Sequence, residues 1–225
     1  MNDYIQLLIR LIRTPSFSKN ESDAAGIIRH FLNERNVHFQ THKNNTWAIR
    51  PGFDPQKPTI LLNSHIDTVK PAPGWTVDPF GALEEGDRIT GLGSNDAGAP
   101  LVVLLAVFMH FMNGKDLPWN LVYAATAEEE NSGPDGFESI KVFLPPIDFA
   151  IVGEPTRMDV AIAERGLLVL DCHAHGKSGH AAREEGENAL YIALDDISRL
   201  RDYAFEKVSD TLGRVKVTAT QIEAG

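Results

Sequence analysis

The chain has a single cysteine, Cys172, among its 225 residues. One thiol cannot form a disulfide within the chain, and zinc sites built from several cysteines are excluded. The sequence also lacks an uninterrupted run of about 18 apolar residues, so no transmembrane helix is predicted. The N-terminal segment has no small-residue cleavage site of the kind that ends a signal peptide. We therefore expect a cytoplasmic protein that does not insert into a membrane.

Basic residues are in the minority, with 21 Lys and Arg against 31 Asp and Glu and a net charge of −10. Nucleic acids and anionic membranes attract basic surfaces, so neither is expected as a partner. Acidity can serve solubility alone, but part of this excess lies in clusters suited to cations. The hydrophobic content of 43% is typical of a globular protein, and the length allows one domain and part of a second.

Helical and strand patterns alternate along the first 160 residues. Apolar residues recur at helical spacing over 4–12. A second helix is predicted from Ser18 to about residue 36, with Ser18 as its cap and Glu21 completing a capping box. The remaining elements predicted here are strands over 37–40, 46–49, 59–63, 121–126 and 149–152 and helices over 100–112 and 136–143.

Three of these strands are short, continuously apolar and followed by polar residues. They lead into His65, Glu128 and Glu154, respectively. Such strands are typical of a buried α/β sheet, and ligands of open α/β sheets bind beyond the carboxyl ends of the strands. We expect an α/β fold with a mixed, mostly parallel sheet flanked by helices, and a binding site at these strand ends.

The pattern changes after Glu164. An alternating strand pattern over 167–175, a helical pattern over 189–205 and a second alternating strand over 215–220 predict the start of a small α+β lid. We therefore expect a catalytic metal-binding domain over 1–163 and the first part of a lid or dimerisation domain over 164–225.

Two polar clusters precede the helix at residue 100. His65 could ligate a metal with Asp67 holding its other ring nitrogen, although a hydrogen-bonded structural pair has the same pattern. The glycine-rich segment 91–98 suggests a nucleotide loop, but its spacing is not that of a dinucleotide-binding or phosphate-binding motif. Its glycines fit better with a bend that directs Asp96 into a site, where a carboxylate could bridge two cations.

Three adjacent carboxylates, Glu128, Glu129 and Glu130, follow the apolar strand over 121–126. A solvated acidic loop would look the same. At the ligand side of a buried sheet, however, one carboxylate could bind a cation while its neighbour takes a proton from water. Glu154 follows the next strand, so one histidine and several carboxylates, all ligand types that zinc accepts, end successive strands.

With these motifs in this order, the sequence resembles the zinc aminoacylase and carboxypeptidase family, which includes acetylornithine deacetylase, succinyl-diaminopimelate desuccinylase and glutamate carboxypeptidases. The contexts around Glu129 and Glu154 resemble acetylornithine deacetylase most. The matching stretches are Ser-His-Ile-Asp-Thr-Val (64–69), Trp-Thr-Val-Asp-Pro-Phe (75–80), Gly-Leu-Gly-Ser-Asn-Asp (91–96), Ala-Glu-Glu-Glu (127–130), Gly-Glu-Pro-Thr (153–156) and Gly-Lys-Ser-Gly-His-Ala-Ala (176–182).

The resemblance implies a two-zinc amidohydrolase, with Co²⁺ as an alternative metal. It implies His65 and Glu154 as ligands of one zinc, Asp96 as a bridge and Glu130 as a ligand of the second zinc. The general base would be Glu129. Two further residues are implied to assist: Asp67 would orient the site, and His180, a lid histidine, would stabilise the oxyanion.

The implied substrate is a small N-acyl amino acid. Within this class we prefer N-acetyl- or N-succinyl-ornithine, which would place the enzyme in arginine biosynthesis. The implied assembly is a homodimer through the lid. A dipeptidase or carboxypeptidase of the same family is an alternative, as is a non-catalytic zinc-binding or dimerisation module. The family's Asp-Met-Lys-Gly is replaced here by Asp-Ala-Gly-Ala (96–99). The family's last ligand, a histidine near its C-terminus, has no counterpart before Gly225, so we expect an incomplete second zinc site and little activity from this chain alone.

Overall fold

A computed structural model describes residues 2–112, 117–180, 182–183 and 185–224. The chain forms two compact units, Met1–Met158 and Asp159–Gly225, which are described separately. Among the described residues, the first unit holds all the strands and all the helices but one. Its elements are α1 (Asn2–Ile12), α2 (Ser22–Glu34), β1 (Gln40–His42), β2 (Asn45–Ile49), β3 (Thr59–His65), β4 (Leu83–Glu85), β5 (Arg88–Thr90), the π-helical turn η1 (Ser94–Gly98), α3 (Ala99–Met112), β6 (Asn120–Thr126), α4 (Phe137–Ile140), the 3₁₀ turn η2 (Lys141–Phe143) and β7 (Phe149–Val152).

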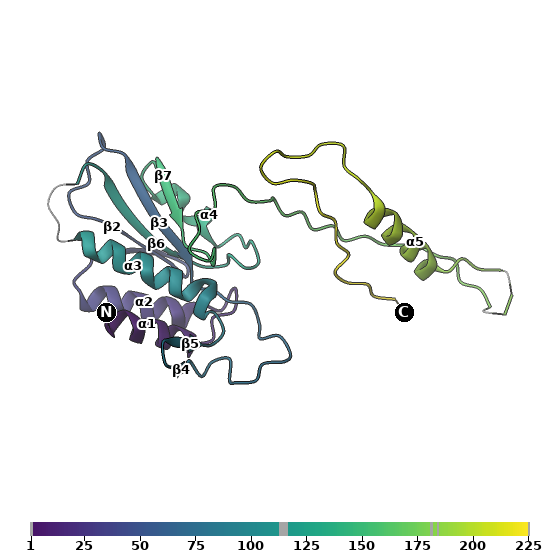
Figure 1. The fold of residues 1–225 in the computed structure, drawn as a ribbon, viewed down its shortest axis with the longest axis horizontal. Coiled ribbons are helices and arrows are strands. Elements are labelled where there is room, and N and C mark those ends of the chain that lie inside the picture. Colours follow the sequence, from purple (N-terminus) through teal and green to yellow (C-terminus); the bar gives the residue numbers. More distant parts are fainter. Residues whose placement is uncertain (1, 113–116, 181, 184, 225) are drawn as a thin grey trace. The chain divides into compact units, whose positions relative to one another are not determined.

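The first unit is built on a five-stranded mixed sheet with the order β1-β2-β6-β3-β7. β3 pairs in parallel with β6 and β7, whereas β2 pairs antiparallel with β1 and β6. The predicted mixed α/β sheet is confirmed, with its four pairings divided equally between the two directions. Because β3, β6 and β7 run in parallel, their carboxyl ends meet at one edge of the sheet (Figure 1).

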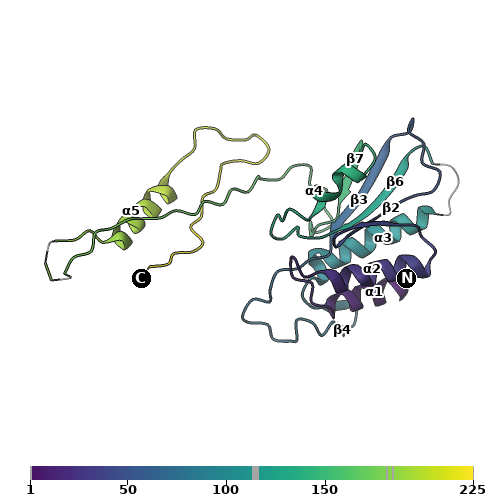
Figure 2. The ribbon, with the colours of Figure 1, turned by 180° about the vertical axis from the view of Figure 1, so that it is seen from behind.

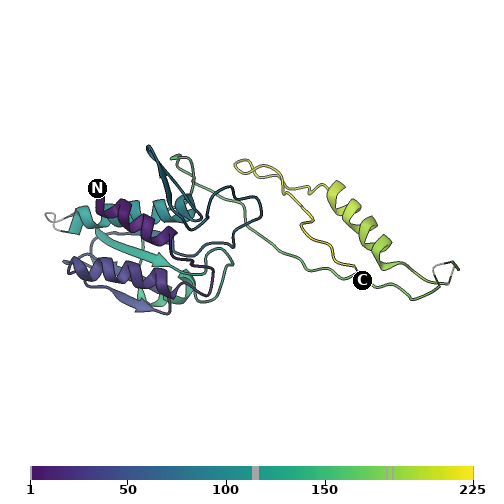
Figure 3. The same ribbon diagram turned by 90° about the horizontal axis from the view of Figure 1, so that it is seen from below.

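Alternation along the strands divides the core between the two faces of the sheet. Leu62 and Tyr123 face the larger cluster, which is completed by α1, α2 and α3 on that side (Figure 3). Leu61 and Val122 face a smaller cluster that includes Ile140 of α4, which lies near β7 (Figure 2). β6 is buried along its whole length, which explains its uninterrupted apolar sequence.

One described helical run, Ser94–Met112, is long and apolar enough to cross a membrane by length and composition. In this structure Leu101, Leu105 and Phe108 of α3 are buried in the core against the sheet. A buried core helix can have the same length and apolar composition as a membrane-spanning helix, so this run by itself does not indicate a membrane span.

The predicted capping box at the start of the second helix is wrong. α2 begins at Ser22, and the Ser18 hydroxyl instead donates to the Asp67 carboxylate at 2.7 Å. The Glu21 carboxylate accepts from the Lys19 backbone N–H at 2.6 Å and from the Asn44 side chain at 2.8 Å. The helix starts four residues after Ser18, with Glu21 at its N-cap, so the Ser18 hydroxyl lies too early in the chain to cap it.

The helix described in the second unit is α5 (Ala189–Asp202), whose N-cap residue Asn188 accepts from the Leu190 N–H at 2.9 Å. The strands predicted over 167–175 and 215–220 do not form in the described chain. Alternating apolar residues become a strand only when a neighbouring strand supplies hydrogen bonds, and neither segment has such a neighbour among the described residues. The domain boundary predicted after residue 163 stays a prediction.

Candidate metal centre and active site

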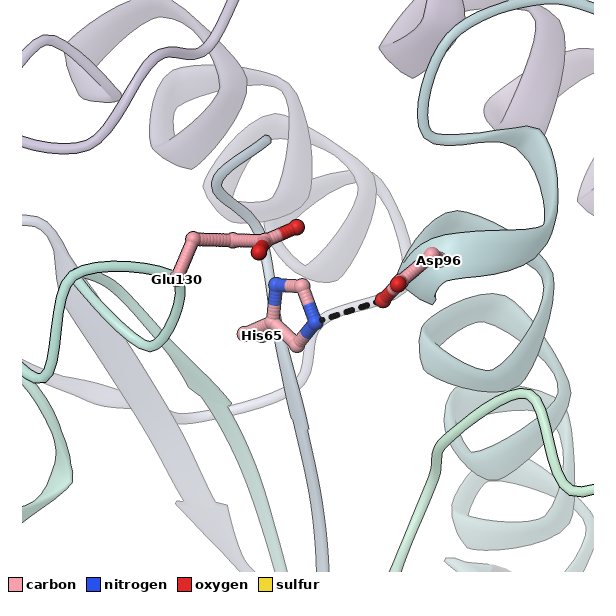
Figure 4. A group of neighbouring side chains, drawn as sticks. All are labelled: His65, Asp96 and Glu130. Atoms are coloured by element: carbon pink, nitrogen blue, oxygen red, sulfur yellow. Dashed lines mark hydrogen bonds and ion pairs between the residues drawn. The ribbon is translucent and has the colours of Figure 1, made fainter. Parts of the chain in front are cut away.

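His65 is the last residue of β3 and the centre of a group of acidic side chains. Its Nε2 lies 3.2 Å from Oδ1 of Asp96, and its side chain is almost fully buried. One donor atom each from His65, Asp96 and Glu130 lies within 4.8 Å of the others. Figure 4 shows the three side chains converging from the end of β3, from η1 and from the loop after β6. The structure therefore brings together three of the four metal ligands predicted from the sequence.

The fourth predicted ligand, Glu154, reaches the same imidazole from the end of β7. Its Oε2 lies 3.8 Å from His65 Nε2. The ladder between β3 and β7 continues one residue further, because the Gly153 N–H donates to the Asn63 carbonyl at 2.7 Å and the Ser64 hydroxyl donates to the Gly153 carbonyl at 2.8 Å. A Cβ at Gly153 would lie 2.9 Å from α3 side-chain atoms, so glycine permits this close approach and places Glu154 at the site.

The glycine-rich segment bends the chain before α3, as predicted, and presents Asp96. The Asp96–Ala97 peptide bond within it is cis. Gly93 has a φ of 72°, and a Cβ there would lie 2.6 Å from a Thr68 methyl carbon. A Cβ at Gly98 would lie 2.5 Å from the Gly93 carbonyl oxygen. These close approaches fold the loop back on itself, with the Asp96 carboxylate directed at His65.

Asp67 is buried behind the histidine and holds the acidic loop. Its Oδ1 accepts from the Glu129 N–H at 3.1 Å, and its Oδ2 accepts from the Glu130 N–H at 3.2 Å and from Ser18 at 2.7 Å. Its backbone carbonyl lies 2.9 Å from His65 Nδ1. A carbonyl can only accept, so this bond puts a proton on Nδ1 and leaves Nε2, in the neutral ring, as the nitrogen available to a metal.

The charges of this group shift the pKa values of its members. Burial lowers the pKa of His65, but hydrogen bonds and negative charges from Asp67 and Glu154 outweigh it and raise the pKa to about 11. A metal at Nε2 therefore competes with a proton. For Asp67, burial is opposed by hydrogen bonds from His65, Ser18 and the acidic loop, which lower the pKa of that carboxyl overall.

Two carboxyls of the acidic loop have raised pKa values. Burial is the first cause for both Glu129 and Glu130, and the negative charges of neighbouring carboxylates add to it. Glu129 Oε2 lies 4.0 Å from His65 Nε2, and the Glu129 side chain is 55% exposed, so it can meet both the metal position and solvent. A carboxylate with a raised pKa suits a general base.

Glu128, the first residue of the acidic triplet, points elsewhere. It has a φ of 54° and is only 6% exposed, and its Oε2 lies 3.5 Å from the Asp135 N–H, away from His65. The positive φ turns the chain at Glu128 so that successive side chains leave it in different directions. Only Glu129 and Glu130 of the triplet belong to the site.

His180, predicted to stabilise the oxyanion, lies in the second unit. Its ring Nδ1 accepts from the Ala182 N–H at 3.2 Å. Its role in the site stays a prediction. The hydrogen bond from Ser18 to Asp67 was not predicted, because the spacing of Ser18 to Glu21 matches a helix cap.

The donor set fits a divalent metal. One imidazole nitrogen and several carboxylate oxygens converge on a point at the sheet edge, and these are ligand types of zinc. Acidic groups so close together repel one another, and a cation relieves that repulsion. The residues that would hold it are His65, Asp96, Glu154 and Glu130.

A family model described as peptidase family M20/M25/M40 matches residues 61–222, which include the whole metal-ligand group. The chain belongs to this family. The match confirms the resemblance at the level of the family. Two curated relatives illustrate the range of names in it. A succinyl-diaminopimelate desuccinylase from Blochmanniella floridana is 28% identical over 230 residues, covering 94% of this chain and 60% of the relative. A probable carboxypeptidase from Emericella nidulans is 30% identical over 248 residues, covering 99% of this chain and 58% of the relative.

Solved structures show the same M20/M25/M40 fold. A tripeptidase from Staphylococcus aureus superposes with a TM-score of 0.61 at 21% identity, covering 88% of this chain and 56% of the tripeptidase. The chain thus spans about three-fifths of the length of the curated relatives it matches. The fold is that of the family, and the hydrolase names belong to the relatives.

Proposed function

We propose that this M20/M25/M40 chain carries the metal centre of an amidohydrolase that removes the acyl group from an N-acyl amino acid with the help of two zinc ions. The observation that supports this most is the convergence of Asp96, Glu129 and Glu154 on Nε2 of His65, at distances of 3.2, 4.0 and 3.8 Å, respectively. A purely structural histidine has no need of three carboxylates. Co²⁺ has similar ligand preferences and could replace zinc.

The ligands divide between two cations. His65 and Glu154 would hold the first, Asp96 would bridge both, and Glu130 would bind the second. Bound cations of this kind polarise the amide carbonyl and lower the pKa of the attacking water. Asp67 keeps the His65 ring oriented with Nε2 facing the carboxylates, through the 2.9 Å contact at Nδ1.

Glu129 would act as the general base. It takes a proton from the attacking water as the water oxygen bonds to the amide carbon. When the C–N bond breaks, the same carboxyl gives its proton to the leaving amine, so the products are a carboxylate and a free amino acid. His180 would donate a hydrogen bond to the oxygen on which negative charge develops.

Two candidate substrates of the N-acyl amino acid class are supported by different observations. The sequence contexts around Glu129 and Glu154 favour N-acetyl- or N-succinyl-ornithine, and hence arginine biosynthesis. The name of the Blochmanniella floridana relative favours N-succinyl-diaminopimelate. Both carry an acyl amide beside a free carboxylate on a chain with a second amine, so we propose an N-acyl diamino acid as the substrate class, with the ornithine derivative as the first candidate.

Because the histidine implied as the last zinc ligand has no counterpart in residues 1–225, activity is measured in a form of the protein extended to the length of its relatives, called the extended form. Loaded with zinc, the extended form is expected to hydrolyse N-acetylornithine, N-succinylornithine or N-succinyl-diaminopimelate with a kcat/KM at least about tenfold above that for dipeptides, since a lost polar contact costs about one such factor. Amine release from the three N-acyl substrates and from dipeptides, measured side by side, checks this. A preference for dipeptides would favour the carboxypeptidase alternative, which the Emericella nidulans relative represents. Zinc binding without hydrolysis of any of them would favour a non-catalytic module.

A homodimer through the second unit is part of the proposal. Leu167, Leu168 and Leu170 are 70–85% exposed in a run of apolar residues, and contiguous apolar surface of this kind marks interaction sites. A monomeric mass in light scattering at micromolar concentration would contradict this part.

A further inference from the structure

One buried side chain joins the two ends of the loop that carries Glu129 and Glu130. Asn45, the first residue of β2, is fully buried. Its Oδ1 accepts from the Ala127 N–H at 2.9 Å, and its Nδ2 donates to the Asp135 carbonyl at 2.7 Å. Ala127 and Asp135 are the two ends of the loop, so a single amide bridges its entry and its exit.

The Asn45 amide also contacts two neighbouring segments of the same polypeptide. Its Nδ2 donates to the His42 carbonyl at 3.1 Å and lies 3.3 Å from the Ser139 hydroxyl. The hydroxyl of Ser139 in turn donates to the Gly136 carbonyl at 2.7 Å and lies 3.1 Å from the Asp135 carbonyl oxygen. Asn45 therefore ties together the hairpin before β2, the loop after β6 and the start of α4.

Part of this loop borders an open pocket. Glu128 and Asp135 line a cavity of about 340 Å³ that also borders Lys19 and Lys43. Lys43 pairs with Asp135 at 3.0 Å, but both side chains are about half exposed, and exposed ion pairs stabilise little. The loop has internal hydrogen bonds, such as that from the Gly133 N–H to the Glu128 carbonyl at 2.9 Å. Asp67 joins it to the segment after β3, and Asn45 joins both of its ends to β2.

We propose that Asn45 is a positioning residue whose amide, by joining Ala127 to Asp135, sets where Glu129 and Glu130 stand against His65. This inference rests on the proposed function of those two glutamates. Asp67 fixes only the backbone N–H groups of Glu129 and Glu130, so without Asn45 the loop can pivot about that contact. A displacement of about 1 Å at a reacting group can cost about 10²-fold in rate.

The test compares Asn45→Asp with Asn120→Asp. Aspartate has the same shape as asparagine but would place an acceptor oxygen against the Asp135 carbonyl. Asn120 is a matched control, because it is also buried, accepts from the Asp54 N–H at 2.8 Å and donates to the Asp54 and Lys57 carbonyls at 2.8 and 3.0 Å. It begins β6, so it lies about 20 Å from the loop along the strand.

We expect both variants to lower the melting temperature. Only Asn45→Asp should lower kcat, measured in the extended form, by about 10- to 100-fold with little change in KM. Only Asn45→Asp should also weaken zinc binding, measured by competition with a chromophoric chelator. If Asn45→Asp does not fold, Asn45→Ser replaces it in the test, because serine removes the bridge without adding charge. The same changes in kcat and zinc binding are expected for Asn45→Ser. Equal kcat, KM and zinc affinity in the Asn45 and Asn120 variants would overturn the inference. Zinc affinity is decisive even if no amide is hydrolysed, and absence of hydrolysis by the unsubstituted extended form would refute the proposed function alone.

Discussion

Replacing Glu129 with glutamine in the extended form is expected to lower kcat for amide hydrolysis by about 10³-fold, within the roughly 10²- to 10⁴-fold range of general acid–base catalysis. Glutamine keeps the size of the side chain but cannot take a proton from water. Glu129 is not among the proposed ligands, so zinc affinity should change little. Initial rates at saturating substrate, together with a zinc titration of the same preparation, measure both quantities.

Glu128→Gln is the matched control for this experiment, because the two residues are neighbours of the same chemistry. Glu128 is directed at the Asp135 N–H rather than at His65, so its variant should keep most of its kcat when measured below its melting temperature. If kcat fell in Glu128→Gln and persisted in Glu129→Gln, the assignment of the base would be wrong.

Replacing His65 with alanine is expected to remove the tightest zinc ion. Zinc sites with four ligands bind with roughly 10–16 kcal/mol, or about 3 kcal/mol per ligand, so the loss of one ligand should weaken binding by about 10²-fold or more. The imidazole is the only nitrogen ligand of the proposed site. Isothermal titration with zinc, or chelator competition, gives the affinity directly, and hydrolysis should fall with it.

The control for that variant is His30→Ala. His30 lies on α2, is more than half exposed and pairs with Glu34 at 3.2 Å, away from the sheet edge. Its loss should leave zinc affinity unchanged. Equal zinc affinity in the His65 and His30 variants would show that the imidazole of His65 is a structural group.

The parts of the fold that follow from local sequence were predictable. β3, β6 and β7 each contain an apolar run, as the strands of a parallel sheet do, and the polar residues after them mark one edge. The expectation that all three strands are buried is wrong for β7, which is exposed because it is the last strand of the sheet. The same pattern is enough to predict that His65 and Glu154 lie near each other. The bend at the glycine-rich segment was also predictable, because a larger side chain at its glycine positions would clash with neighbouring atoms.

Long-range hydrogen bonds were not predictable from local patterns. The spacing of Ser18 and Glu21 matches a capping box, but Ser18 finds a carboxylate 49 residues away. Three consecutive glutamates do not by themselves indicate which side chain points away from the site, because that depends on the positive φ at Glu128. The alternating segment 167–175 failed as a strand because its periodicity says nothing of a partner.

The central claim is that a metal binds between the ends of β3, η1 and the loop after β6. Anomalous diffraction at the zinc absorption edge, from crystals of this protein grown with zinc, tests it most directly. We expect a strong peak about 2.0–2.1 Å from Nε2 of His65, with Asp96 and Glu154 oxygens in the same coordination shell. Zinc at saturating concentration with no peak at His65, or with peaks only at other residues, would contradict it.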